Sequence, residues 1–145
     1  MDPIRLIRDK AELQGSGYFE LLPDEYRGRC WNEESVFLAE ETFGLIEPII
    51  ERHEPRFDHY SVVDIRRPAW ERIAADLEQL AERLEQAALV DELRGEVRFL
   101  FTTTEAEFAR QFRMNADALA QMARELAAWV RERLQNYESI SVLGM

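Results

Sequence analysis

The sequence contains a single cysteine, Cys30, so the chain cannot form an intramolecular disulfide bond. For the same reason, it cannot build a zinc site from cysteine ligands alone. A thiol-nucleophile site would combine Cys30 with His59 and a nearby aspartate, but no catalytic signature surrounds the cysteine. We therefore interpret Cys30 as a small, partly buried residue beside Trp31.

Lysine is almost absent as well: Lys10 is the only lysine among the 18 basic residues, and all the others are arginine. Arginine pairs bidentately with carboxylates and phosphates, but we interpret this bias as the codon usage of a GC-rich genome. Glycine-rich phosphate-binding loops are missing too. The lone Gly28 between Arg27 and Arg29 lacks the run of backbone amides that holds a phosphate.

The chain also lacks long apolar segments. No run approaches the roughly 18 apolar residues that a membrane helix requires, and the opening MDPIRLIRDK contains no apolar signal core. We therefore expect a cytoplasmic protein without a membrane partner. The length of 145 residues fits one domain, 1–145, and the content of 46% hydrophobic and 32% charged residues is ordinary globular composition.

Negative charge is in excess, with a formal net charge of −11. Residues 33–58 contain 8 acidic residues and 2 basic ones, so much of the excess lies in one segment. Such a field repels nucleic acid and anionic lipid and favours basic proteins or cations. We therefore expect no nucleic-acid partner. The alternative interpretation is that the charge serves solubility alone.

Hydrophobic periodicity predicts a mainly α fold, a bundle of three main helices at about residues 33–53, 69–93 and 105–136. The first helix has Asn32 as its expected N-cap and a kink or break expected at Pro48. The second and third helices have long apolar rows that we expect to form the core. These rows are Trp70, Ile73, Ala74, Leu77, Leu80, Ala81, Leu84 and Ala88 in the second helix, and Phe108, Phe112, Leu119, Met122, Leu126, Val130 and Leu134 in the third.

Two or three short strands are expected to add a minor sheet at one edge of the bundle. Residues 57–65 and 96–104 hold β-branched and aromatic residues at a spacing near two. The apolar tail, residues 139–145, could pair with either of them. Residues 3–14 are interpreted as a short helix, and residues 17–31 as a loop or one short turn packed onto the core, because a proline interrupts any regular element there.

Two acidic helix edges are the most specific chemical pattern. Four glutamates fall on one edge of the first expected helix, and four more fall on one flank of the second. If these edges adjoin, they form a carboxylate surface that receives lysines and arginines of a partner. The eight glutamates are Glu33, Glu40, Glu47, Glu51, Glu71, Glu78, Glu82 and Glu85.

Phe37 falls off the apolar side of the first expected helix. An exposed aromatic residue beside an acidic row is a candidate hot spot for binding a partner. Contact with the N-terminal segment, or with a second subunit, is an equally weighted alternative.

His53, Glu54, Asp58 and His59 form the densest cluster of potential metal ligands. Imidazole and carboxylate groups suit Zn, Fe or Mn. Their spacing matches neither HExxH nor the Glu-x-x-His pairs of di-iron bundles. His53 also falls on the apolar side of its helix, where a hydrogen-bonded core histidine is the usual arrangement. We therefore expect no cofactor.

These patterns favour a non-enzymatic, acidic protein-interaction module that binds a basic protein. Inhibitors of the immunity-protein or antitoxin type belong to this class, although no motif identifies one here. Two alternatives stay open. One is a small metal-dependent enzyme or metal sensor built around His53, Asp58 and His59, and the other is a homodimer whose third helix forms the interface.

Overall fold

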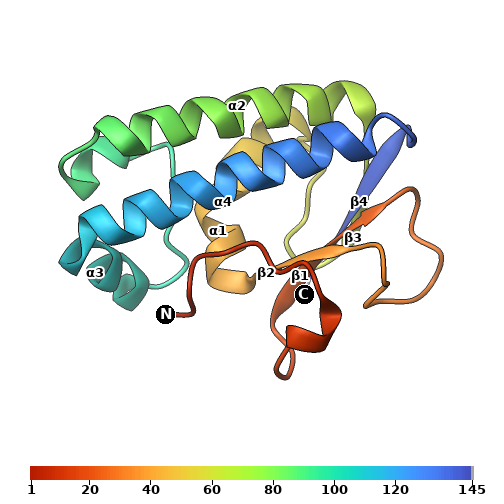
Figure 1. Cartoon of the computed structure of the whole chain (residues 1–145), viewed down its shortest axis with the longest axis horizontal. Coiled ribbons are helices and arrows are strands. Elements are labelled where there is room, and N and C mark those ends of the chain that lie inside the picture. The colour runs from red at the N-terminus through yellow and green to blue at the C-terminus, as the bar shows by residue number, and fades with distance from the viewer. Residues whose placement is uncertain (145) are drawn as a thin grey trace.

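The computed structural model describes residues 1–144 and combines a layer of helices with a four-stranded antiparallel sheet (Figure 1). The strands are β1 (Tyr18–Pro23), β2 (Val36–Ala39), β3 (Val62–Arg66) and β4 (Ser139–Leu143). The helices are α1 (Glu40–His53), α2 (Arg67–Gln86), α3 (Thr102–Arg110) and α4 (Phe112–Arg133), with short 3₁₀ turns η1 (Lys10–Glu12) and η2 (Val90–Leu93). Within this part of the chain, no helix combines the length and the apolar character needed to cross a membrane.

The sheet has the strand order β2-β1-β4-β3, and all neighbouring strands are antiparallel. The last strand, β4, therefore lies inside the sheet, where Val142 is opposite both Leu21 of β1 and Val63 of β3. The mainly α bundle expected from periodicity is wrong, because a complete sheet makes the architecture α/β. Of the two alternative partners considered for the tail, the structure contains the pairing with the region of β3.

The segment of residues 17–31, expected to be a loop or short turn, contains β1, which lies in the interior of the sheet. A strand buried on both faces has no alternation of apolar and polar residues. Its hydrophobic pattern therefore matches neither the period of a half-buried strand nor that of an amphipathic helix. One face of β1 packs against the helices. Over the other face, the loop of residues 24–35 is held by the buried carboxylate of Glu20. Asn32 is not a helix N-cap but donates to Glu20 from both its backbone and its side chain.

Only the second part of the expected helix 33–53 is helical, because residues 36–39 form β2 and α1 begins at Glu40. β2 pairs with β1 on one side. On its other side, Phe37 exchanges two backbone hydrogen bonds with Ile7, at 2.8 and 2.9 Å. The side chain of Phe37 is fully buried. The expectation of an exposed aromatic residue at this position is therefore wrong, and Phe37 has no surface to offer a partner.

α1 continues through Pro48 without the expected break. The ring of a proline inside a helix approaches the carbonyl group four residues earlier, and Gly44 at that position leaves room for adjustment. Gly44 also has a packing role, because a Cβ atom built there would lie 2.6 Å from Cγ of Leu100. The irregular segment of residues 94–101 therefore passes directly against α1.

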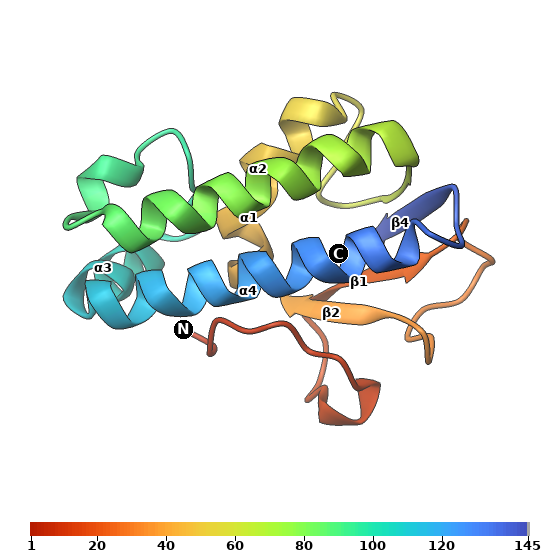
Figure 2. The same ribbon diagram turned by 45° about the horizontal axis from the view of Figure 1, so that its top comes forward.

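The two longest helices, α2 and α4, lie side by side and run in opposite directions (Figure 2). Their expected apolar rows form the core, with two exceptions: Phe112 is half-buried, and Ala88 lies exposed beyond the end of α2. Trp70 Nε1 donates to the carbonyl oxygen of Ile140 at 2.9 Å, which joins the start of α2 to β4.

Both long helices are shorter than expected. The expected helix 69–93 corresponds to α2, which ends at Gln86, and to the separate turn η2. The expected helix 105–136 is divided at Gln111 into α3 and α4. Asn115, near the start of α4, donates from Nδ2 to two carbonyl oxygens of α3 at 3.2 and 3.3 Å. This side chain stabilises the break because it supplies donors to the end of α3.

The remaining segments also differ from the expectations. Residues 57–65 contain most of β3, whereas residues 96–104 form no strand: they are irregular up to the start of α3 at Thr102. Residues 3–14 contain only the 3₁₀ turn η1.

Candidate functional site

Three glutamates of α1 meet two other segments at a surface hollow of about 310 Å³. One is the loop of residues 54–61, which follows α1 and connects it to β3. The other is the irregular segment 94–101. We call this site the acidic hollow. Its lining residues are Glu40, Glu47, Glu51, His59, Tyr60, Arg98, Leu100 and Phe101.

α1 places the three glutamates on one flank, because positions separated by seven and by four residues lie close together on a helix. Glu47 is almost fully buried, whereas the side chains of Glu40 and Glu51 are 30% and 40% exposed. The two accessible carboxylates therefore stand on either side of a buried one. An incoming cation would meet Glu40 and Glu51 first.

His59 lies between two of these carboxylates. Its Nδ1 atom is 2.8 Å from Oε2 of Glu47, and its Nε2 atom is 2.8 Å from Oε2 of Glu40. A neutral imidazole has one N–H donor, so only the protonated ring can donate to both carboxylates. Burial acts to lower the pKa of His59, but the hydrogen bonds and charges of Glu40 and Glu47 outweigh it and raise the pKa above its ordinary value.

Arg98 closes the other side of the hollow. Its two terminal nitrogens contact the two carboxylate oxygens of Glu51 at 2.8 and 3.0 Å, and Nη1 lies 3.7 Å from Oε1 of Glu47. The hydrogen bond from Arg98 is the main reason that the pKa of Glu51 is lowered. The three glutamates carry three negative charges against two positive charges on His59 and Arg98. The site therefore keeps an excess negative charge.

The loop that carries His59 is docked onto the end of the sheet. The His59 ring packs edge-on against Phe19 of β1, with ring centroids 4.8 Å apart. Gly144 N donates to the carbonyl oxygen of Ser61 at 3.0 Å. Gly144 has to be a glycine for this approach, because a Cβ atom there would collide with the backbone oxygens of His59 and Ser61. These contacts place Tyr60 at the rim of the hollow.

Two aromatic rings border the charged groups and face solvent. Tyr60 is 74% exposed and Phe101 is 52% exposed. Single exposed apolar residues are common on protein surfaces. Two large aromatic side chains beside a partly paired carboxylate cluster are a more specific arrangement, since aromatic residues are enriched at binding hot spots.

A second hollow, of about 210 Å³, is lined in part by Gly144, Cys30 and Trp31. Trp31 is 41% exposed and has a φ of +62°. This left-handed conformation is an outlier for a bulky side chain. A hydrogen bond of 2.6 Å from Trp31 N to Oε1 of Glu20 holds it there. The structure thus presents an exposed tryptophan on a strained backbone, while Cys30 beside it is exposed rather than partly buried.

The two acidic rows expected from the sequence do not adjoin. Glu78 and Glu85 of α2 pair with Arg131 and Arg124 of α4, at 2.8 and 2.6 Å. The opposite flank of α2 faces α1, through Asp76. The row on α2 therefore lies away from the acidic hollow. The other two glutamates of this row, Glu71 and Glu82, are exposed.

Of the first row, only Glu40, Glu47 and Glu51 come together. Glu33 lies in the loop before β2 and pairs with Lys10 at 2.9 Å. The helical spacing of the three α1 glutamates was visible in the sequence. Nothing in the sequence indicated that Arg98 and Phe101 would join these glutamates, because they lie about fifty residues further along the chain.

The proposed metal ligands are divided among different partners. His53 Nε2 lies 2.7 Å from Oδ2 of Asp76, whereas His59 is held by glutamates of α1. Asp58 accepts a hydrogen bond from the backbone N of Tyr60 at 2.9 Å, and Glu54 pairs with Arg56. Within residues 1–144, no group of three or more His, Cys, Asp or Glu side chains has an arrangement that could hold a metal ion.

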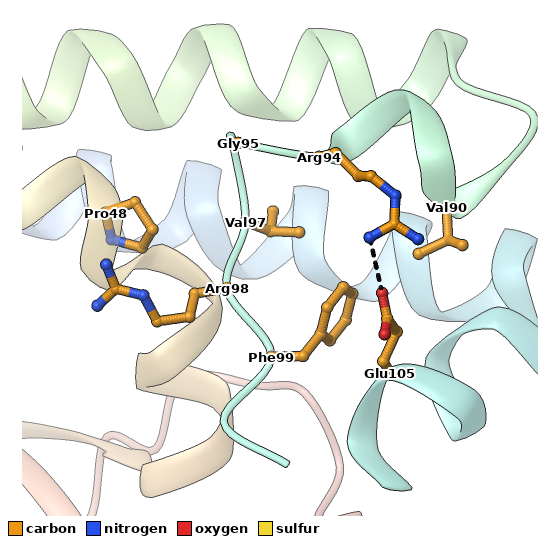
Figure 3. Close-up of a pocket in the computed structure, with 8 residues that line it drawn as sticks. All are labelled: Pro48, Val90, Arg94, Gly95, Val97, Arg98, Phe99 and Glu105. Atoms are coloured by element: carbon orange, nitrogen blue, oxygen red, sulfur yellow. Dashed lines mark ion pairs between the residues drawn. The ribbon is translucent and has the colours of Figure 1, made fainter. Parts of the chain in front are cut away.

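A further hollow, of about 430 Å³, lies beside α1 and is lined by Pro48, Val90, Arg94, Gly95, Val97, Arg98, Phe99 and Glu105 (Figure 3). Arg94 reaches across it toward Glu105, at 3.5 Å. Arg98 extends on the side of Pro48, where its charge is taken up by the glutamates of α1. Both arginines of this hollow are thus paired with carboxylates, and Phe99, its one aromatic lining residue, is half-buried. The acidic hollow is the stronger candidate site.

No known protein family, curated protein or solved structure matches this chain.

Proposed function

We propose that this protein is a non-enzymatic binding module that receives a basic segment of a partner protein in the acidic hollow. The observation that carries the proposal is that two accessible carboxylates, Glu40 and Glu51, line one hollow together with the exposed rings of Tyr60 and Phe101. Carboxylates attract a cationic side chain, and aromatic faces stabilise it further through cation–π contact.

An arginine is the side chain that best fits this chemistry. Its planar guanidinium pairs bidentately with a carboxylate and stacks on aromatic rings. Arg98 already makes such a bidentate contact with Glu51 from within the chain. The partner's arginine would pair with Glu40, or replace Arg98 at Glu51. The overall charge of −11 would speed the association with a basic protein.

Trp31 supports a larger contact surface. Gly144 lines the hollow of Trp31 and also donates a hydrogen bond to the loop that carries His59 and Tyr60. Backbone strain at an exposed residue is a recurrent feature of functional sites, and tryptophan is enriched among residues that dominate binding energy. A partner that places an arginine in the acidic hollow could therefore cover Trp31 with an apolar side chain.

The chemistry can be tested with a defined probe. Nuclear magnetic resonance spectra of the full chain would be recorded during titration with N-acetyl-arginine amide. The matched control ligand is its citrulline analogue, which has nearly the same shape but no charge. We expect arginine to shift signals of Tyr60, His59 and Phe101, and citrulline to leave them in place. Equal shifts with both ligands, or shifts elsewhere only, would overturn the proposal.

Substitutions then locate the binding groups. We expect Glu40→Gln and Glu51→Gln each to weaken arginine binding by about tenfold, the effect of losing one charged contact. Glu82→Gln on α2 is the matched control, because it removes an exposed carboxylate of the expected second row that lies outside the hollow. Added salt should weaken binding to the wild-type protein. If Glu82→Gln weakens binding as much as Glu51→Gln does, the site assignment is wrong.

A further inference from the structure

The loop of residues 54–61 contacts α1 through the side chains of Phe57 and His59. Phe57 lies against Phe43, with ring centroids 5.7 Å apart. His59 makes the only polar side-chain contacts between this loop and the α1 residues that line the hollow, in the chain as described. The loop is anchored at its far end by the hydrogen bond from Gly144 to Ser61. The position of Tyr60 therefore depends strongly on what His59 does.

We infer that His59 is a pH-sensitive latch: its protonated ring holds the loop of residues 54–61 closed against α1, and loss of the proton releases it. The importance of this latch for partner binding rests on the proposed function, but its existence in the free protein does not. The reason for release is geometric. A neutral ring donates to one carboxylate only, and its remaining nitrogen lone pair then faces the other carboxylate at hydrogen-bond distance.

The charged groups around His59 come from two elements. α1 contributes Glu40 and Glu47 as direct partners and Glu51 further away. The segment 94–101 contributes Arg98, which does not contact the ring but neutralises part of the same carboxylate cluster.

The other neighbours of His59 are uncharged or turned away. The rings of Phe19 and Tyr60 both pack edge-on against it, with centroids 4.8 Å away. The carboxylate of Asp58 is engaged by the backbone N of Tyr60. The two carboxylates at the ring nitrogens therefore dominate its environment, in keeping with the raised pKa of His59.

Deprotonation changes two properties of the acidic hollow. The excess negative charge of its side chains rises by one, because the imidazolium charge is lost. The almost fully buried Glu47 also loses a charged partner, and a buried carboxylate without its partners is strongly destabilising. Opening of the loop lets water reach Glu47 and moves Tyr60 away from the rim. The closed, aromatic-bordered form of the hollow therefore belongs to the protonated state.

The latch can be tested on the full chain without any partner. Nuclear magnetic resonance would follow the ring signals of the two histidines between about pH 5 and pH 9, a range that spans the ordinary histidine pKa of about 6.5. Hydrogen exchange at the Gly144 amide would report loop docking, because this amide donates to Ser61. The exchange rates would be compared as protection factors, which divide out the intrinsic pH dependence of amide exchange.

We expect the pKa of His59 to lie above the ordinary histidine value, and the protection of Gly144 to fall by about tenfold as His59 loses its proton, the effect of one charged hydrogen bond. His59→Gln should show the low protection at every pH. His53→Gln is the matched control and should keep the pH-dependent step, since His53 pairs with Asp76 instead. Protection that stays constant through the titration of His59, or a step that His53→Gln abolishes, would overturn the latch.

The arginine titration separates this inference from the proposed function. If the pH-dependent step is present and arginine does not bind, the latch stands and the binding function is wrong. If arginine binds at the acidic hollow and protection of Gly144 does not depend on pH, the function stands and the latch is wrong.

Discussion

The side chain of Leu100 occupies the space that a Cβ atom on Gly44 would require, with Cγ of Leu100 2.6 Å from the Cβ position. This contact lets the segment 94–101 pass close to α1, and the same segment carries Arg98 and Phe101 to the acidic hollow. Gly44 therefore links the packing of α1 to the geometry of the candidate site.

We expect Gly44→Ala to lower the free energy of unfolding by about 1 kcal/mol. The overpacking penalty, about 1–3 kcal/mol, should exceed the gain of about 1 kcal/mol from replacing glycine inside a helix. Urea denaturation of the two proteins measures the difference.

The matched background is Leu100→Ala, which removes the colliding atoms. In that background, Gly44→Ala should be stabilising by about 1 kcal/mol, because only the gain in helix propensity is left. A destabilising effect of the same size in both backgrounds would show that the contact with Leu100 is not what requires glycine.

Glu20 is expected to be essential for the loop of residues 24–35. Its buried carboxylate accepts hydrogen bonds from Trp31 N, Asn32 N, Asn32 Nδ2 and Ser35 Oγ, at 2.6 to 2.9 Å. A glutamine would turn an N–H₂ group toward some of these donors, so Glu20→Gln should lower the free energy of unfolding by about 2–3 kcal/mol.

Urea denaturation measures the loss of unfolding free energy in Glu20→Gln. Hydrogen exchange at the Trp31 and Asn32 amides should be faster in this variant than in the wild-type protein. Glu34→Gln is the control, because Glu34 lies in the same loop but pairs with Arg27 at the surface. Its effect should be below about 0.5 kcal/mol. Similar losses for the two variants would contradict a special role for Glu20.

Asp76 should make stability depend on pH at the acidic end. It accepts contacts from His53 at 2.7 Å and from Arg52 at 2.8 Å, which join α1 to α2. Burial acts to raise the pKa of Asp76, but these two partners outweigh it and lower the pKa below its ordinary value. A lowered pKa means that the stabilisation is present above the unfolded-state pKa of about 3.9 and is lost as the pH falls through the folded-state pKa.

Asp76→Asn should therefore lower the free energy of unfolding by about 1–2 kcal/mol at neutral pH. The difference from the wild-type protein should disappear as the pH falls through the lowered folded-state pKa of Asp76. Glu78→Gln, on the opposite flank of α2, should have an effect below about 1 kcal/mol, because its pair with Arg131 is about half exposed. A difference for Asp76→Asn that persists at low pH would mean that its charge is not the cause.

His59 should produce the opposite dependence at the alkaline end. Its pKa is raised, so its stabilisation is complete below the unfolded-state pKa of about 6.5 and is lost as the pH rises through the folded-state pKa. The destabilisation caused by His59→Gln should therefore be largest near pH 6 and should shrink at higher pH. Denaturation of the wild-type and variant proteins across this range tests the sign, which a purely structural role of the ring would not produce.

The sequence indicated the helical core better than the sheet. The apolar rows of α2 and α4 recur with the helical period, so residues such as Leu77 and Leu126 could be assigned to the core from local spacing alone. β1 and β2 were missed, because a strand buried on both faces has no alternating pattern. Phe37 was placed on a helix for the same reason, although it belongs to β2.

The candidate site was visible in part. The spacing of Glu40, Glu47 and Glu51 placed them on one flank of a helix, and that grouping is what the structure contains. The sequence also joined His59 to a cluster with His53 and Asp58, whereas the structure directs these three side chains to different partners. Sequence proximity was misleading there, because α1 ends at His53 and the chain turns before it reaches His59.

By itself, the sequence determined the acidic character, the helical rows and the alignment of three glutamates, because each depends on composition or on residues within a few turns. Only the tertiary structure decided the order of the sheet, in which Leu22 lies opposite Ser141. It also decided the meeting of Glu47, His59 and Arg98. Contacts between such distant positions depend on how all the elements pack together, and no local period records them.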